Sequence, residues 1–131
     1  MKFLSFSREG QRGFGAWVDG GVVDLSARYP DLPDLRAAIR ADRLSELAAA
    51  AGNTFADFGP EDFRYLPTIP NPEKIICIGV NYANRNAEYK DGTAAATYPS
   101  VFMRSPESLT GHLQPMLRPP ESDQLDYERN H

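Results

Sequence analysis

The sequence predicts an α+β fold in which a small N-terminal domain of β-meander and helices precedes the start of a second, strand-rich domain. Three observations support this prediction. Apolar and polar residues alternate over Lys2–Ser7, as in a half-buried strand. Apolar residues after Asp34 recur at helical spacing. A proline-rich segment, residues 66–72, then separates these elements from a continuous apolar run at 74–79.

Composition limits the classes of function. The chain has 131 residues, with 14 Lys and Arg against 18 Asp and Glu, a net charge of −4, and 41% hydrophobic residues. This balance is globular, and the even spread of charge leaves no basic stripe, so we expect no nucleic-acid partner. The apolar runs are too short to cross a bilayer, so we expect no membrane partner. A single cysteine, Cys77, excludes an internal disulfide and fits a cytoplasmic location.

The N-terminal residues predict a meander of short strands. Gly10 and Gly13 bracket a first turn, and an Asp-Gly step suits a second, tight hairpin turn. The expected segments are a strand at Lys2–Ser7, a strand at Gly15–Val18, a turn at Asp19–Gly21 and a strand at Val22–Leu25. Trp17, Val22 and Val23 are expected in the core or packed on the hairpin.

Two short helices, or one helix broken near Asp42, are predicted to follow. Asp34 and Asp42 each precede an apolar-periodic run, as a helix N-cap does, and Gly52-Asn53 ends the second run. The three prolines between 66 and 72 fix an extended segment that is neither helix nor interior strand. We therefore place a domain boundary there, which gives domains at 1–71 and 72–131.

The second domain is predicted to begin with a strand at 74–79 that is buried on both faces, with Cys77 as a small core residue. A short helix is expected at 81–89, and His112 is expected on a surface loop. Strands or extended pieces are expected at 99–103, 115–117 and 124–128.

Two groups of polar residues could carry chemistry. Asn81, Arg85 and Glu88 share one face if they lie on a helix, although an exposed Arg–Glu ion pair explains the same spacing. Asp126, Glu128 and Asn130 project to one face if they lie on a strand. Such oxygen-bearing side chains suit a hard cation, and a solvated acidic edge strand is the alternative.

These segments, in this order, resemble the fumarylacetoacetate hydrolase family. The family pattern is a Lys-Ile-Ile-Cys-hydrophobic-Gly strand, then Asn-Tyr-x-x-His-x-x-Glu, a hydrophobic-Phe-x-(Lys/Arg) strand and an Asp-Tyr-Glu-Gly-Glu strand. This chain matches it at 74–79, 81–88, 101–104 and 126–128. The resemblance covers residues 72–128, and residues 1–71 look like the smaller N-terminal domain of many members. It implies an incomplete mixed β-roll, interrupted at the Arg129-Asn130-His131 ending.

The resemblance also implies a site. It makes Glu128 a ligand of Mg²⁺ or Mn²⁺ in the intact protein, Asn81 and Tyr82 substrate-binding residues, and Glu88 and Arg85 the residues at the catalytic positions. The substrate would be a small 2-oxo or 1,3-diketo acid, and the intact protein would be a homodimer. Such enzymes cleave C–C bonds hydrolytically, isomerise or decarboxylate through a metal-stabilised enolate.

The chain departs from the family pattern at two functional positions. Asn130 stands where a second metal-binding glutamate belongs, and Arg85 stands where hydrolytic members carry the histidine of a His–Glu dyad. Arginine stays protonated and cannot act as a general base. We therefore expect the intact protein to favour isomerisation or decarboxylation over hydrolysis, and these residues alone to be inactive and marginally stable. The alternatives are a non-catalytic binding or assembly module derived from the fold, and an unrelated α+β domain that matches by chance.

Overall fold

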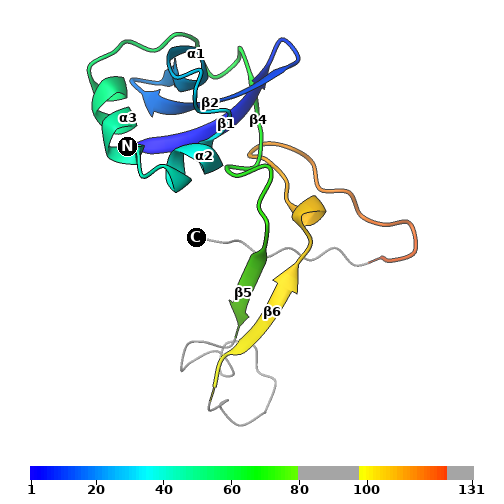
Figure 1. The fold of residues 1–131 in the computed structure, drawn as a ribbon. Coiled ribbons are helices and arrows are strands. Elements are labelled where there is room, and N and C mark those ends of the chain that lie inside the picture. Colours follow the sequence, from blue (N-terminus) through cyan, green and yellow to red (C-terminus); the bar gives the residue numbers. More distant parts are fainter. Residues whose placement is uncertain (80–97, 124–131) are drawn as a thin grey trace.

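The computed structural model describes residues 1–79 and 98–123, which form an α+β arrangement with two antiparallel sheets (Figure 1). The larger sheet has the strand order β3-β2-β1-β4, and the smaller sheet pairs β5 with β6. No helix in the described part of the chain is long and apolar enough to span a bilayer. The elements are β1 (Lys2–Arg8), β2 (Gln11–Val18), β3 (Gly21–Asp24), α1 (Leu25–Arg28), α2 (Leu35–Arg40), α3 (Leu44–Gly52), β4 (Arg64–Tyr65), β5 (Ile75–Gly79), β6 (Ser100–Arg104) and the 3₁₀ turn η1 (Pro106–Ser108).

Two-residue turns connect the first three strands. Asp19 and Gly20 both have positive φ, 48° and 83°, as the predicted hairpin turn requires. Glu9 and Gly10, with φ of 52° and 79°, form the first turn. The expectation that Gly13 borders this turn is wrong, because Gly13 lies inside β2 opposite Phe6. A Cβ at Gly13 would stand 2.7 Å from the Phe6 ring, so this position needs glycine for close packing.

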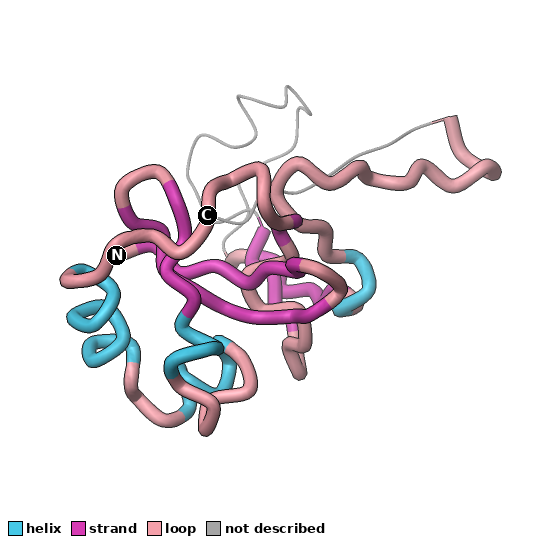
Figure 2. Tube along the Cα trace, turned by 90° about the horizontal axis from the view of Figure 1, so that it is seen from above, coloured by secondary structure: helices cyan, strands magenta, loops and turns pink. Residues whose placement is uncertain are grey.

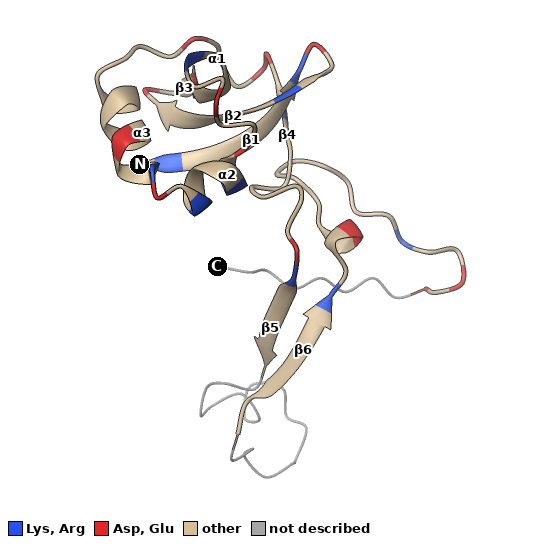
Figure 3. Cartoon of the chain, in the orientation of Figure 1, with Lys and Arg blue, Asp and Glu red and all other residues tan. Residues whose placement is uncertain are grey.

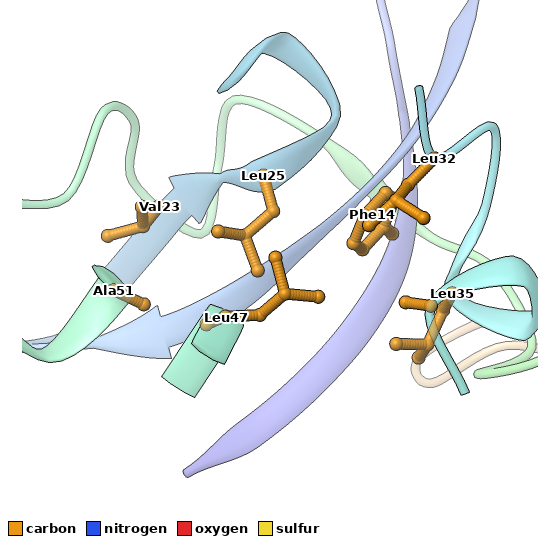
Figure 4. Packing of buried hydrophobic residues seen from close by; sticks show 9 residues of the cluster. Phe14, Val23, Leu25, Leu32, Leu35, Leu47 and Ala51 are labelled. Carbon is orange, nitrogen blue, oxygen red and sulfur yellow. The ribbon is translucent and has the colours of Figure 1, made fainter. Parts of the chain in front are cut away.

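Both faces of the larger sheet are buried. The three helices lie along one face of the sheet (Figures 1 and 2). Beneath them Phe14, Leu25 and Leu47, all fully buried, are at the centre of the core (Figure 4). Because strand side chains alternate, the neighbouring residues point to the opposite face. There Phe6 and Val22 pack with Phe58, and the half-buried rings of Trp17, Phe63 and Tyr65 surround them. The predicted packing of Trp17, Val22 and Val23 is confirmed.

The predicted helices are present, but one predicted cap is wrong. Asp34 caps α2, since its carboxylate accepts a hydrogen bond from the Ala37 amide at 2.7 Å. Asp42 ends α2 instead of beginning α3: its φ is +55°, its amide donates to Ile39 O, and the Arg43 amide donates to Ala38 O. This is the hydrogen-bond pattern of a Schellman C-cap. The helix α1 was not predicted, and it starts at Leu25, where the sequence suggested strand.

The proline-rich segment contains no helix or strand, as predicted. It is held against the N-terminal domain by side-chain hydrogen bonds. Ser5 Oγ donates to Thr68 O at 2.8 Å, and Asn71 Nδ2 donates to the Asp34 carboxylate at 2.8 Å. The attachment continues past Asn71, because the Glu73 carboxylate forms ion pairs with Arg36 and Arg40 of α2. The boundary between 71 and 72 remains a prediction.

The predicted strand at 74–79 is present as β5, but its burial is not as predicted. Only Cys77 is buried, at 8% exposure, whereas Ile76 and Ile78 are 62% and 58% exposed. The reason is that β5 pairs with β6 alone among the described residues, and no described element covers its other face. Residues 115–117 form no strand. The predicted helix at 81–89 and the predicted strand at 124–128 lie outside the described residues.

An ion pair fixes α1 to the loop before β4. The Arg28 guanidinium contacts both carboxylate oxygens of Asp57, at 2.5 and 2.8 Å. The Asp24 amide also donates to Asp57, at 2.7 Å. The hydrogen bonds from Arg28 have the largest effect on the pKa of Asp57, and they lower it below its ordinary 3.8. The hydrogen bond from the Asp24 amide lowers it further, whereas burial acts in the opposite direction. The ionised carboxylate is therefore the form that the fold stabilises.

Replacing Asp57 by Asn should lower the free energy of unfolding at pH 7 by about 1 kcal/mol, a modest value because solvent reaches the pair. A carboxylate whose pKa is lower in the folded than in the unfolded state stabilises the fold at pH values above its unfolded-state pKa. This contribution is lost as the pH falls through the folded-state pKa. The difference between wild type and D57N should therefore shrink below about pH 4. Urea unfolding at pH 7 and pH 3 measures it. D123N, at an exposed ion pair with Arg118, is the control and should change stability little at either pH. An equal D57N effect at both pH values would contradict this role.

Candidate functional site

The five residues predicted to form the site lie outside the described part of the chain. Asn81, Tyr82, Arg85 and Glu88 fall within 80–97, and Glu128 falls within 124–131. Their grouping into one site therefore stays a prediction from the sequence. It does describe the strands that precede and follow the first group and the loop that leads to the second.

The β5–β6 hairpin supports the first group. Its register pairs Gly79, the last residue of β5, with Ser100, the first residue of β6. The chain therefore returns to the hairpin directly opposite the position from which it leaves. The four predicted residues between 81 and 88 fall, in the sequence, between these two paired positions.

The two faces of this hairpin differ. Cys77 pairs with Phe102, and these side chains are on the same face, where Cys77 is buried. The guanidinium of Arg104 lies 5.3 Å from the centre of the Phe102 ring on this side. The opposite face carries only apolar residues, and all are exposed: Ile76, Ile78, Val101 and Met103.

A turn after η1 anchors the second half of the chain to the first. Gly111 is buried against the backbone of Tyr65, where an added Cβ would stand 2.5 Å from the Tyr65 carbonyl oxygen. The ring of His112 meets the Tyr65 ring edge-on, with centroids 5.0 Å apart. The Tyr65 ring in turn packs edge-on against the Phe63 ring, with centroids 4.7 Å apart. His112 is exposed, as predicted, but no sequence signal indicated that it would extend the aromatic cluster of the first domain.

A shallow hollow of about 370 Å³ lies beside this anchor. His112 and Tyr65 line it together with Glu61 and Arg64. These side chains supply both charges and an imidazole to one open surface. They do not amount to a metal site: no cluster of three or more His, Cys, Asp or Glu side chains suited to a metal ion occurs within residues 1–79 and 98–123.

The loop toward Glu128 closes into a turn before it leaves the described residues. The Ser122 amide donates to Pro119 O at 3.3 Å. Arg118 Nη1 donates to Ser122 O and contacts the Asp123 carboxylate, both at 3.0 Å. The segment that carries the candidate metal ligand therefore follows a turn closed by hydrogen bonds.

Comparison with known proteins gives one family for the second half of the chain. Residues 74–130 match the family model described as "Fumarylacetoacetate (FAA) hydrolase C-terminal". This range contains all five predicted site residues.

Curated relatives match most of this chain but only part of their own length. The Xenopus laevis protein "Oxaloacetate tautomerase fahd2, mitochondrial" is 32% identical over 119 residues, 84% of this chain and 35% of that protein. The Bos taurus protein "Oxaloacetate tautomerase FAHD2A, mitochondrial" is 27% identical, over 83% of this chain and 35% of its own. The Dictyostelium discoideum "Fumarylacetoacetate hydrolase domain-containing protein 2 homolog" is 28% identical over 92% of this chain and 40% of its own. The chain thus spans a little over a third of these relatives.

A solved structure shares the fold. The "putative HpcE protein from Mycobacterium smegmatis" superposes with a TM-score of 0.64 and 21% sequence identity. The superposition covers 91% of this chain and 41% of that one. The likeness therefore includes both the N-terminal domain and the hairpin region.

Replacing Gly111 by Ala should release the turn from β4, because the new methyl group would meet backbone, which cannot yield as a flexible side chain does. We expect the His112 ring proton shifts in NMR spectra to lose the contribution of the neighbouring Tyr65 ring while signals of the Phe14 core stay unchanged. Gly59→Ala, where the nearest atom to a new Cβ is an Asp62 carboxylate oxygen at 3.5 Å, is the matched control. Retention of the native His112 shifts in G111A would show that the anchor does not depend on this contact.

Proposed function

Because the chain belongs, through residues 74–130, to the fumarylacetoacetate hydrolase family, we propose that it supplies the N-terminal part of an enzyme that converts a 2-oxo acid through an enolate. The family match over the candidate residues is the observation that carries this proposal. The names of the Xenopus and Bos relatives favour keto–enol tautomerisation of an oxaloacetate-like dicarboxylic acid among the reactions predicted from sequence.

The proposed reaction moves one proton. A proton leaves the carbon next to the 2-oxo group, negative charge develops on the oxo oxygen, and a proton then adds to that oxygen. In the proposed site Glu88 is the carboxylate that accepts and returns the proton. Asn81 and Tyr82 donate hydrogen bonds that orient the substrate oxygens.

Arg85 determines which reaction is favoured. A guanidinium cannot remove a proton from water, so the chain lacks the histidine that would generate an attacking hydroxide. It can bind a carboxylate through two parallel hydrogen bonds, and it favours the ionised form of a nearby Glu88. These properties support tautomerisation or decarboxylation of a carboxylic acid substrate and oppose hydrolysis.

The metal requirement is the weakest fit between this chain and the family pattern. Glu128 is the ligand that this chain would contribute, and Asn130 offers only a neutral amide oxygen. A bound Mg²⁺ or Mn²⁺ would supply Lewis-acid stabilisation of the enolate oxygen. One carboxylate is a poor donor set for a divalent cation, so a tight site needs further oxygen ligands that a partner polypeptide would provide.

A non-catalytic assembly module is the second candidate function. One observation favours it: the β5–β6 hairpin, whose strands precede and follow residues 81–88 in the sequence, exposes a face made only of apolar side chains. A homodimer, a cytoplasmic location and the identity of the acid substrate remain proposals for the whole protein.

The catalytic proposal is tested in a chimera in which residues 1–131 replace the aligned segment of the Xenopus laevis relative. We expect the chimera to tautomerise oxaloacetate faster than it hydrolyses an acylpyruvate, both followed by ultraviolet absorbance. Glu88→Gln should lower kcat for tautomerisation by about 100-fold, because the proton acceptor is lost. Glu121→Gln, at an exposed carboxylate outside the proposed site, should leave it unchanged. Brisk acylpyruvate hydrolysis with Arg85 in place would refute the proposal.

The metal proposal is tested on the chain itself by Mn²⁺ titration followed by electron paramagnetic resonance. We expect weak binding, with a Kd of about 1 mM, that Glu128→Gln abolishes. Asn130→Glu restores the second carboxylate of the family pattern and should tighten binding at least about tenfold. Gln114→Glu adds the same charge on the preceding loop and should not tighten it. Equal effects of N130E and Q114E would mean that net charge, and not a site at Glu128, attracts the cation.

A further inference from the structure

Three neighbouring strands of the larger sheet place two arginines and a serine in one row. Arg12 of β2 is directly opposite Ser7 of β1, and Ser7 is directly opposite Arg64 of β4. Residues opposite each other in an antiparallel pair point to the same face, so the three side chains share one face of the sheet. We call these three residues the arginine row. Adjacent strands lie about 5 Å apart, so the backbones of the two arginines stand about 10 Å apart with Ser7 between them.

The arginine row is open to solvent within the described part of the chain. Arg12 and Arg64 are exposed, and Ser7 is half-buried. Phe14 lies two residues along β2 on the same face and is fully buried in the core beneath the helices, so the helix layer leaves the row uncovered. Figure 3 shows basic residues of β1 and β2 in blue beside the turn that joins these two strands. A ligand can therefore reach the row without displacing the core.

The two arginines of the row have no side-chain partner within residues 1–79 and 98–123. Every other arginine in these ranges contacts a carboxylate or an aromatic ring. Two acidic residues of adjoining segments leave the row uncompensated. Glu9, in the turn after β1, contacts Arg8 at 3.6 Å. Glu61 lines the same hollow as Arg64 but forms no ion pair with it. The two unpaired guanidinium groups among the described residues are thus the two that the sheet register brings into one row.

Two unpaired cations on the same face of a sheet favour an anion between them. Like charges on neighbouring strands repel each other, and a bound anion removes this repulsion. A guanidinium group binds an oxyanion through two parallel N–H groups, and a serine hydroxyl can donate a further hydrogen bond. A carboxylate has only two oxygens, which one guanidinium can occupy by itself. The three terminal oxygens and the double charge of a phosphate match two arginines and a hydroxyl group.

We propose that the arginine row is a binding site for a phosphate dianion, either free or as the terminal group of a small phosphorylated compound. Arg12 and Arg64 bind the phosphate from either side, and Ser7 donates a third hydrogen bond. The row lies entirely in the first domain and shares no residue with the site proposed for the 2-oxo acid, so this inference does not rest on the proposed function. A phosphate bound there stabilises the first domain, because a ligand that binds only the native state favours that state by mass action.

The test is a titration of the full chain with inorganic phosphate at about pH 8 and constant ionic strength, where phosphate is a dianion. We expect the backbone amide signals of the row in NMR spectra to shift and to saturate at millimolar phosphate. Arg12→Gln and Arg64→Gln should each weaken binding at least about tenfold, because each variant loses charge-assisted hydrogen bonds. Ser7→Ala should weaken it about threefold, because one hydrogen bond is lost.

Arg8→Gln is the matched control. It removes the same charge from the residue next to Ser7, but the Arg8 guanidinium lies 5.0 Å from the centre of the Phe58 ring, on the opposite face of the sheet. Its phosphate affinity should stay within about threefold of wild type. Glycerol phosphate is the second probe: tighter binding than inorganic phosphate identifies a phosphorylated compound as the ligand, and weaker binding identifies the free ion.

Several outcomes would overturn the proposal. Phosphate shifts no amide signal of the row, or the two glutamine variants bind it as tightly as wild type. An equal loss of affinity in R8Q and R12Q would mean that diffuse positive charge, and not the row, attracts the anion. Acetate that binds as tightly as phosphate would assign the row to carboxylates instead. Trp17 fluorescence confirms that the first domain of each variant is folded, because Trp17 packs against the aromatic cluster of that domain.

Discussion

A β-hairpin has two faces, and within residues 1–79 and 98–123 only one face of β5–β6 carries a buried side chain. Cys77 is buried on the covered side, while Ile76 and Ile78 beside it are more than half exposed. The larger sheet obeys the same alternation of side chains but has a layer on each face, helices on one and aromatic rings on the other. The first domain can therefore be held together by its own contacts. The hairpin has no such second layer among the described residues, and its outer face is exposed there.

The two parts of the chain are nevertheless joined at two places. The proline-rich segment is tied to the cap of α2 at Asn71, and Glu73, just after it, forms ion pairs with Arg36 and Arg40 of α2. The chain then returns at Gly111 and His112, which pack on β4. Proline restricts the backbone of the first segment, and close packing on the Tyr65 backbone leaves no room for a side chain at Gly111 in the second. The hairpin is therefore flanked by two attachments to the first domain. The loop toward Glu128 begins at the second of them, the one at Gly111 and His112.

The sequence could predict those structural features that a few neighbouring residues determine, and it could not predict those that depend on residues far apart in the chain. The cap by Asp34 and the turn at Asp19-Gly20 depend on a few neighbouring residues, and both were predicted. Asp42 has the same residue type as Asp34, but the carbonyl groups at the end of α2 accept its amide and the next one, so it closes a helix. The burial of β5 could not be predicted from its apolar run, because burial depends on what covers the strand. The contact of His112 with Tyr65 joins residues 47 positions apart and leaves no local pattern.

Arg129 also replaces the glycine of the family pattern, but only Arg85 and Asn130 stand at proposed functional positions, and both change the charge of the proposed site in the same direction. Asn130 removes a negative charge from the cation position, and Arg85 adds a fixed positive charge at the dyad position. Together they make the site about two charges more positive than the pattern with neutral histidine. A more positive site binds a cation less well and a dicarboxylate better, because both effects follow from Coulomb interactions. If the proposed site holds, Arg85 takes over part of the substrate binding that a metal provides in the family pattern, and proton transfer at a bound 2-oxo acid loses less from these substitutions than hydrolysis does.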